Sequence, residues 1–357
     1  MHSSHTEIAT LGEFGLIDHL TEGIDLKNAE TLKGVGDDCA VMDYNGTGKR
    51  VLVTTDMLME GIHFDLIYTP LKHLGYKAAQ VNFSDVYAMN GRPKQLLVSV
   101  AVGRRMSVEA MEELYAGLRL ACDMHGVDLV GGDTTSSLTG LAISITCIGE
   151  ADNEDIVYRN GAKDTDLICV SGNLGAAYMG LQIMEREKAV FESQQDKAGE
   201  TAQPEFAGRE YLLERLLKPE ARRDIIENLA KAGIKPTAMM DISDGLSSEL
   251  HHICRQSGTG CRIYEERIPL DYQTAVAAEE FNLNVTTCAL NGGDDYELLF
   301  TVPLTQHEAV SQIDDVKVIG HITKPELGLA LIARDGGEFE LKAQGWNPLA
   351  EQTSSEQ

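Results

Sequence analysis

The 357-residue chain has few basic side chains and no long apolar run. It holds 30 lysines and arginines against 56 aspartates and glutamates, which gives a formal charge of −26. Such an acidic surplus disfavours binding to nucleic acid or to an anionic membrane surface, because both attract basic proteins. No apolar run approaches the ~20 residues that a membrane-spanning helix needs. We therefore expect neither nucleic acid nor membrane among its partners.

Paired cysteines and a signal peptide are also missing. The seven cysteines are scattered, and none forms a C-x-x-C pair, so the pattern favours neither a zinc ribbon nor a thioredoxin-type site. An odd, scattered set is typical of reduced thiols. The N-terminal stretch MHSSHTEIATLGEFGL lacks the basic, apolar and small-residue order of a signal peptide. These absences predict a cytoplasmic protein.

Hydrophobic periodicity predicts an α+β chain of two domains, residues 1–150 and 151–357. Residues 191–208 are polar and poor in large apolar side chains, which predicts a mobile insertion. The first domain is expected to contain strands at 50–56, 95–103, 128–130 and 140–150, with helices at 70–91 and after Ser107. The second is expected to contain strands at 166–171, 238–241, 260–264, 286–290 and 296–302, with helices at 173–188, 209–217, 219–232, 245–257 and 271–281.

Aspartates gather in glycine turns and at the ends of predicted strands. An aspartate beside a glycine is ordinary turn chemistry, and for any single position that interpretation is as good as a functional one. Turn chemistry alone does not explain the whole set, because two carboxylates 4 Å apart repel by ~4 kcal/mol at an effective dielectric of about 20. Oxygen ligands without clustered His or Cys suit Mg²⁺. The set comprises Asp37, Asp38, Asp56, Asp85, Asp133, Asp241, Asp244, Asp294 and Asp295.

The usual phosphate-binding signatures are absent. The chain has no G-x-x-x-x-G-K-[ST] loop and no H-R-D or D-F-G set. GNLGAA (172–177) only loosely resembles a dinucleotide fingerprint. Arg159 is the best-placed basic candidate, although a surface arginine is an equally good interpretation. A magnesium-rich site would therefore have to hold phosphates by other means.

The ordered motifs resemble the thiamine-monophosphate kinase family, within the aminoimidazole ribonucleotide synthetase-like superfamily. The resemblance implies an N-terminal domain that pairs its sheet across a homodimer, a C-terminal α/β domain, and ATP held between the two. It also implies direct, Mg²⁺-dependent transfer of the ATP γ-phosphoryl to thiamine monophosphate, giving thiamine diphosphate. The motifs that carry it are GVGDDCAV (34–41), TTDMLMEGIHF (54–64), KAAQVNFSDVYAMNGRP (77–93), VGGDTT (130–135), YRNGAK (158–163), DISDGLSSEL (241–250) and NGGDDYELLF (291–300).

Position by position, the resemblance implies three groups of site residues. The metal ligands are Asp38, Thr54, Thr55, Asp56, Asp85, Asp133, Asp241 and Asp244, with Asp37 a less certain partner of Asp38. The ATP contacts are Gly132, Asp133, Arg159 and Ser243. The substrate contacts are His63, Asp294 and Trp346.

Two of the substrate contacts depart from the family pattern or have a competing interpretation. Asp294 replaces a glutamate in the family's GGEDYEL, which shortens its reach by about one bond and favours a water-mediated contact. Trp346 is matched to the family's C-terminal aromatic near the substrate ring. The competing interpretation is that it is only a buried tryptophan of the C-terminal tail.

Two other functions stay open at this point. A sister-branch synthetase would use ATP to phosphorylate an amide oxygen or selenide, but the chain has no N-terminal Cys-Lys pair and no C-terminal cysteine. A non-catalytic protein would bind cations at the same acidic turns without nucleotide. The kinase hypothesis needs no general base, since a phosphomonoester has a second pKa of ~6 and is already ionised.

Overall fold

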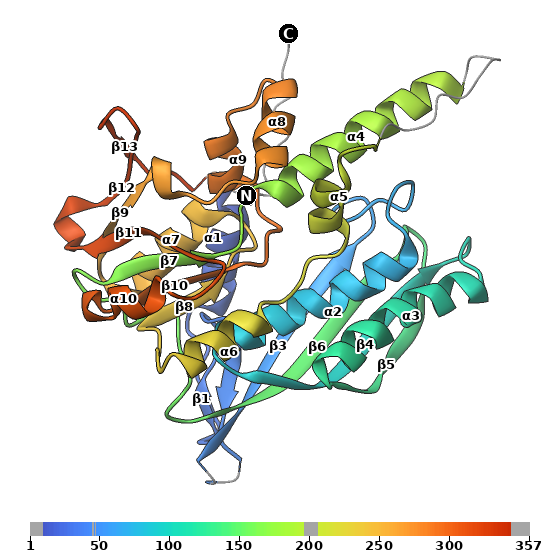
Figure 1. Ribbon diagram of the computed structural model, residues 1–357. Helices are drawn as coiled ribbons and strands as arrows, with labels where there is room; N and C mark the ends of the chain where they lie inside the picture. Colours follow the sequence, from blue (N-terminus) through green and yellow to red (C-terminus); the bar gives the residue numbers. More distant parts are fainter. Residues whose placement is uncertain (1–9, 45, 47, 196–205, 344–357) are drawn as a thin grey trace, which may run out of the picture.

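The computed structural model describes residues 10–44, 46, 48–195 and 206–343. It is built on two β-sheets, one formed by residues 31–152 and the other by residues 167–340, each carrying helices (Figure 1). The two sheets share no strand. The predicted α+β class is confirmed, while the domain boundary at 150/151 stays a prediction.

The first sheet has the strand order β1-β2-β3-β6-β4-β5. Its strands are β1 (Thr31–Lys33), β2 (Ala40–Met42), β3 (Lys49–Met59), β4 (Arg92–Gly103), β5 (Asp128–Ser137) and β6 (Ala142–Asp152). β3 and β6 pair antiparallel along their whole length. Among the described residues, β5 pairs only with β4, in parallel, and it is exposed at nearly every residue. One edge of the sheet is therefore a long, uncovered strand.

Two helices, α2 (Leu71–Ala88) and α3 (Val108–His125), lie together over this sheet (Figure 1). The predicted cap of α3 is confirmed, because the Ser107 hydroxyl accepts a hydrogen bond from the backbone N–H of Ala110 at 3.2 Å. A glycine of each helix faces the other helix. A Cβ at Gly75 would lie 1.9 Å from the Leu114 carbonyl oxygen, and one at Gly117 would lie 1.9 Å from that of Lys72. The two backbones are therefore in direct contact.

The second sheet has the order β13-β12-β9-β11-β7-β10-β8. Among its described strands, only the β9–β12 pair is parallel. Its strands are β7 (Leu167–Ser171), β8 (Ala238–Asp241), β9 (Gly260–Tyr264), β10 (Leu298–Val302), β11 (Val316–Thr323), β12 (Leu329–Ile332) and β13 (Glu338–Glu340). β7, β8 and β10 are buried at every residue, so the core of this part lies on both sides of them.

The remaining helices lie outside the first sheet, and α4 projects away from the second sheet (Figure 1). They are α1 (Gly12–Thr21), α4 (Ala176–Gln195), α5 (Glu210–Leu217), α6 (Arg223–Lys231), α7 (Leu246–Ser257), α8 (Tyr272–Glu280), α9 (Val285–Asn291) and α10 (His307–Val310). The predicted strand at 286–290 is wrong, because this segment is α9. Its start is capped by Asn284, whose side-chain oxygen accepts a hydrogen bond from the backbone N–H of Thr287 at 3.0 Å.

The predicted insertion at 191–208 begins as helix, since α4 continues to Gln195. Residues 196–205 and Trp346 lie outside the described residues. Among the residues that are described, no helix is both long and apolar enough to cross a membrane.

Candidate active site

A cavity of about 1430 Å³ opens between the two parts of the chain. One side is formed by β3, the loop that follows it, and α2. The other is formed by α4, α9 and the loops after β8 and α9, and α1 contributes Glu13, Leu16 and Ile17. A molecule that spans this cavity would contact both halves of the chain.

Three carboxylates converge at one end of the site. Asp38 lies in the turn before β2, Asp85 lies on α2, and Asp241 ends β8. One oxygen from each lies within 4.8 Å of the others. The Ser84 hydroxyl donates to Asp241 at 2.6 Å, which ties α2 to the second sheet. The structure thus brings together three of the predicted metal ligands from separate elements.

The environment of this cluster favours a cation. Burial raises the pKa of Asp38 to about 7 against the opposing effect of Arg159, and it raises the pKa of Asp241 to about 6. Burial and the neighbouring carboxylates also raise the pKa of Asp85. Asp38 Oδ2 is buried without a hydrogen-bond partner in the described part of the chain. An all-oxygen set with an unpartnered carboxylate oxygen fits a hard divalent cation such as Mg²⁺.

β3 adds the three predicted ligands of the T-T-D motif. The Thr54 hydroxyl donates to the Asp85 carboxylate. Asp56 and Thr55 line the cavity, and the Thr55 hydroxyl donates to the Ile145 carbonyl at 2.9 Å. Burial, reinforced by the charge of Asp38, raises the pKa of Asp56 to about 6. Thr54 and Asp56 therefore extend the acidic cluster along the strand.

Arg159 faces this cluster rather than the surface. Its Nη2 lies 2.6 Å and its Nε 3.2 Å from Asp38 Oδ1. Asp37 accepts a hydrogen bond from the Arg159 backbone N–H at 3.1 Å and lies 3.3 Å from the Lys33 ammonium. The two adjacent aspartates thus have different partners, a backbone amide and lysine for Asp37 and a guanidinium for Asp38.

Gly132 and Asp133 are not brought to the cluster. Both lie within β5, whereas the sequence predicted a loop there, because the backbone pairs with β4 as far as Ser137. Asp133 is exposed, and its side chain accepts a hydrogen bond from the backbone N–H of Thr134. β6 and β4 lie between β5 and β3, so three strand spacings, roughly 14 Å, separate β5 from Asp56.

The loop after β8 carries Ser243 and Asp244 into the cavity lining. Glu249 on α7, which is buried, accepts hydrogen bonds from the backbone N–H groups of both, at 3.0 and 2.8 Å. At Gly293, where φ is +69°, a Cβ would lie 2.5 Å from the Ser243 carbonyl oxygen. Two loops are thereby held backbone to backbone beside the cavity.

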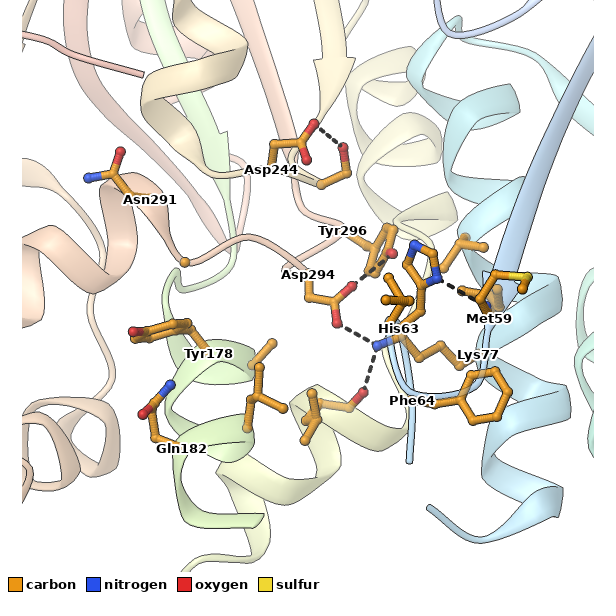
Figure 2. A pocket seen from close by; sticks show the side chains of 18 of the residues that line it. Met59, His63, Phe64, Lys77, Tyr178, Gln182, Asp244, Asn291, Asp294 and Tyr296 are labelled. Atoms are coloured by element: carbon orange, nitrogen blue, oxygen red, sulfur yellow. Dashed lines mark hydrogen bonds and ion pairs between the residues drawn. The ribbon is translucent and has the colours of Figure 1, made fainter. Parts of the chain in front are cut away.

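His63 and Asp294 face the cavity from opposite halves of the chain (Figure 2). The backbone N–H of Met59 donates to His63 Nδ1 at 3.0 Å, which leaves the ring proton on Nε2. Burial lowers the pKa of His63. Asp294 Oδ1 accepts a hydrogen bond from the Tyr296 hydroxyl at 2.9 Å. The neutral imidazole is thus a hydrogen-bond donor.

Lys77 is a site residue that the sequence reasoning missed. Its ammonium lies 2.5 Å from Asp294 Oδ2, a contact marked by a dashed line in Figure 2, and 3.3 Å from the Leu216 carbonyl oxygen. The available signal was its spacing, because Lys77, Val81 and Asp85 stand four residues apart on one face of α2 and all line the cavity. Glu249 was missed as well, since an acid inside a helix carries no signal of the loop that it holds.

Two family models match the chain. The N-terminal domain of AIR synthase related protein matches residues 36–151, and the C-terminal domain matches residues 166–330. The thiamine-monophosphate kinase of Aquifex aeolicus strain VF5 is 36% identical over 94% of this chain and 97% of its own length. That of Bacillus subtilis strain 168 is 30% identical over 94% of this chain and 99% of its own. The chain belongs to the thiamine-monophosphate kinase family.

Solved structures agree with this family assignment. AaThiL complexed with AMPPCP and TMP superimposes with a TM-score of 0.80 and 33% identity, over 97% of this chain and 100% of that one. Thiamine monophosphate kinase from Aquifex aeolicus gives a TM-score of 0.72 and 32% identity, over 91% and 98%. The resemblance and the two-domain fold drawn from the motifs are thereby confirmed. The roles of individual site residues stay predictions.

Proposed function

We propose that this enzyme phosphorylates thiamine monophosphate to thiamine diphosphate by direct, in-line transfer of the ATP γ-phosphoryl, in the presence of several Mg²⁺ ions. The similarity to thiamine-monophosphate kinases and to AaThiL with AMPPCP and TMP supports the ATP-dependent reaction. The observation that carries the site assignment is the meeting of Asp38, Asp85 and Asp241 from both halves of the chain beside one cavity.

The acidic cluster would hold the metal. Asp38, Asp85 and Asp241 are the central ligands, with Thr54, Thr55, Asp56 and Asp244 beside them. When bound, Mg²⁺ supplies positive charge that offsets the repulsion between donor and acceptor phosphates. Arg159 and Ser243 would contact the nucleotide, and Arg159 already stands against the cluster at Asp38. Divalent charge thus takes the place of the lysine of a conventional phosphate-binding loop.

The chain's other residues position the acceptor. The acceptor phosphate has a second pKa of ~6, so no side chain needs to remove a proton from it. His63 offers only its Nε2–H, because the Met59 backbone N–H occupies Nδ1, and this suits a positioning donor rather than a base. Asp294 is the second acceptor contact. Trp346, predicted as the third, lies outside the described residues.

A homodimer would complete the site. β5 is an exposed edge strand that carries Leu129 and Val130 with 37% and 55% of their surface exposed. An uncovered edge of this kind is a template for pairing with another strand. Gly132 and Asp133 lie on it, too far from their own cluster to reach Asp56. We assign them to the metal and ATP site of the second copy, which β5 would face across the dimer.

The dimer assignment is tested by placing a charge on this edge. Val130→Lys should give a monomer in sedimentation velocity and should lose activity along with the dimer. Leu327→Lys, at an exposed leucine near the second sheet, should do neither. A fully active monomer would show that Asp133 acts within its own chain or not at all.

The reaction itself is tested by ADP release, with and without thiamine monophosphate. The proposal expects ADP only when both the acceptor and Mg²⁺ are present, with thiamine diphosphate formed in equal amount. ADP release driven by an amide or by selenide would favour a sister-branch synthetase. Cation binding without any turnover would favour a non-catalytic protein.

A further inference from the structure

One wall of the cavity has no part in the chemistry described so far. Tyr178 and Gln182 stand one turn apart on the same face of α4, and Asn291 ends α9. All three line the cavity. Figure 2 shows them on one side of it, with His63 and Lys77 on the other and Asp294 between. The cavity therefore extends well past the predicted acceptor contacts.

The Tyr178 side chain packs against the backbone of Gly292. A Cβ at Gly292 would lie 2.7 Å from Tyr178 Cβ and 3.1 Å from its Cγ. The ring base thus rests on the loop two residues before Asp294. An aromatic ring supported in this way offers a flat surface on which a heteroaromatic ring can stack.

Two of the polar side chains of this wall, Tyr178 and Gln182, are open to a ligand. Among the described residues, neither the Tyr178 hydroxyl nor the Gln182 amide has a hydrogen-bond partner. An amide carries both a donor and an acceptor, which matches a ring nitrogen next to an exocyclic amine. The wall therefore suits an uncharged, nitrogen-containing aromatic ring.

Building on the proposed function, we propose that Tyr178 and Gln182 bind the aminopyrimidine ring of thiamine monophosphate, Tyr178 by stacking and Gln182 by hydrogen bonds. Asp56 and Asp85 line the same cavity, so one elongated molecule can reach from this wall to the acidic cluster. Adenine carries a similar edge and is the competing occupant. The acceptor is favoured because the wall adjoins Asp294. Of the two proposed nucleotide contacts, Ser243 lines the cavity near the acidic cluster's loop and Arg159 does not line it.

The test compares a whole acceptor with one that lacks the pyrimidine. Tyr178→Leu and Gln182→Leu should each raise KM for thiamine monophosphate at least tenfold, with kcat and KM for ATP within about threefold of the unchanged enzyme. The truncated probe is 4-methyl-5-(2-phosphoethyl)thiazole, used as a competitive inhibitor, and its inhibition constant should stay the same. Tyr178→Phe should keep a normal KM. Tyr272→Leu, at a tyrosine that is 80% exposed on α8, is the matched control.

Each alternative gives a different result. An equal loss of affinity for the truncated probe, or an unchanged KM for thiamine monophosphate, would overturn the pyrimidine assignment. A raised KM for ATP would place adenine on this wall instead. If the unchanged enzyme released no ADP with thiamine monophosphate, the proposed function would fail, and that result is independent of these variants.

Discussion

The Lys77 ammonium lies 2.5 Å from the Asp294 carboxylate, and this ion pair joins α2 to the loop after α9. The other oxygen of Asp294 accepts a hydrogen bond from Tyr296. Both oxygens are therefore engaged within the chain. Asp294 also has a φ of +62°, a left-handed conformation in which aspartate is enriched. Asp294 thus holds its own loop in place.

The ion pair should make Lys77 and Asp294 interdependent. Lys77→Met and Asp294→Asn should each raise KM for thiamine monophosphate about tenfold, because either change releases the loop. The double variant should be no worse than the poorer single one, with a coupling of about 1.4 kcal/mol, since contacting residues are not additive. Steady-state kinetics of the three variants measures this. Fully additive losses would show that the two residues act separately.

Glu249 should act by positioning the loop that carries Ser243 and Asp244. Glu249→Ala leaves two backbone N–H groups without their acceptor, at about 1–3 kcal/mol for each buried group, and kcat/KM should fall at least tenfold. Glu249→Gln keeps an acceptor oxygen and should stay within about threefold of normal. If Gln were as poor as Ala, the carboxylate charge rather than the loop contact would be the important feature.

The acidic cluster should be needed for turnover and not for folding. Asp85→Asn should lower kcat by about 10³-fold or more by removing a metal ligand. Its melting temperature should not fall, because one of several repelling carboxylates is gone. Asp123→Asn, at an exposed position on α3, should behave like the unchanged enzyme. Near-normal activity of Asp85→Asn would sink the shared-metal proposal.

His252 should weaken the fold in acid. Burial, helped by Arg159 and Arg255, lowers its pKa to about 4, and the ring packs against Phe14 with centroids 4.6 Å apart. As the pH falls through 6.5, the unfolded chain takes up a proton that the folded chain does not. The free energy of unfolding should therefore drop by about 2 kcal/mol between pH 7.5 and pH 5 from this residue alone.

Urea unfolding at the two pH values measures this effect. His252→Gln should lose about that much of the pH dependence, because the glutamine does not titrate. His307→Gln, at an exposed histidine, should keep the slope of the unchanged protein. The assignment is contradicted if His252→Gln keeps that slope too.

The sequence predicted the strands that carry the site aspartates, because an apolar, β-branched run before an aspartate is a clear local signal for a strand. RVLVTTD lies in β3, which continues past Asp56 to Met59 because its pairing with β6 extends that far, and AMMDISD became β8 followed by its loop. VTTCALN failed, because its β-branched residues favour a strand while the Asn284 cap favours a helix. The VGGDTT loop failed for a different reason, since pairing with β4 across more than thirty residues overrides the glycines.

The site was predictable only in so far as its residues lie in local motifs. Asp38, Asp85 and Asp241 stand out in the sequence, and the structure brings them together. Lys77 does not stand out, because its partner Asp294 lies 217 residues away and the segment reads as an ordinary helix. No local pattern encodes an ion pair of that separation.

The glycine contact between α2 and α3 fixes the position of α2, and with it the distance between two site residues on that helix. Lys77 and Asp85 are eight residues apart on α2, which spans about 12 Å along the helix axis. Because Gly75 and Gly117 bring the two backbones into direct contact, α2 has no room to slide or bend toward α3. The helix therefore holds Lys77, beside the proposed acceptor contacts, at a fixed distance from Asp85 in the acidic cluster. Any closure around substrates must therefore come from other cavity-lining segments, such as the loop after β3 or the loops of the second half of the chain.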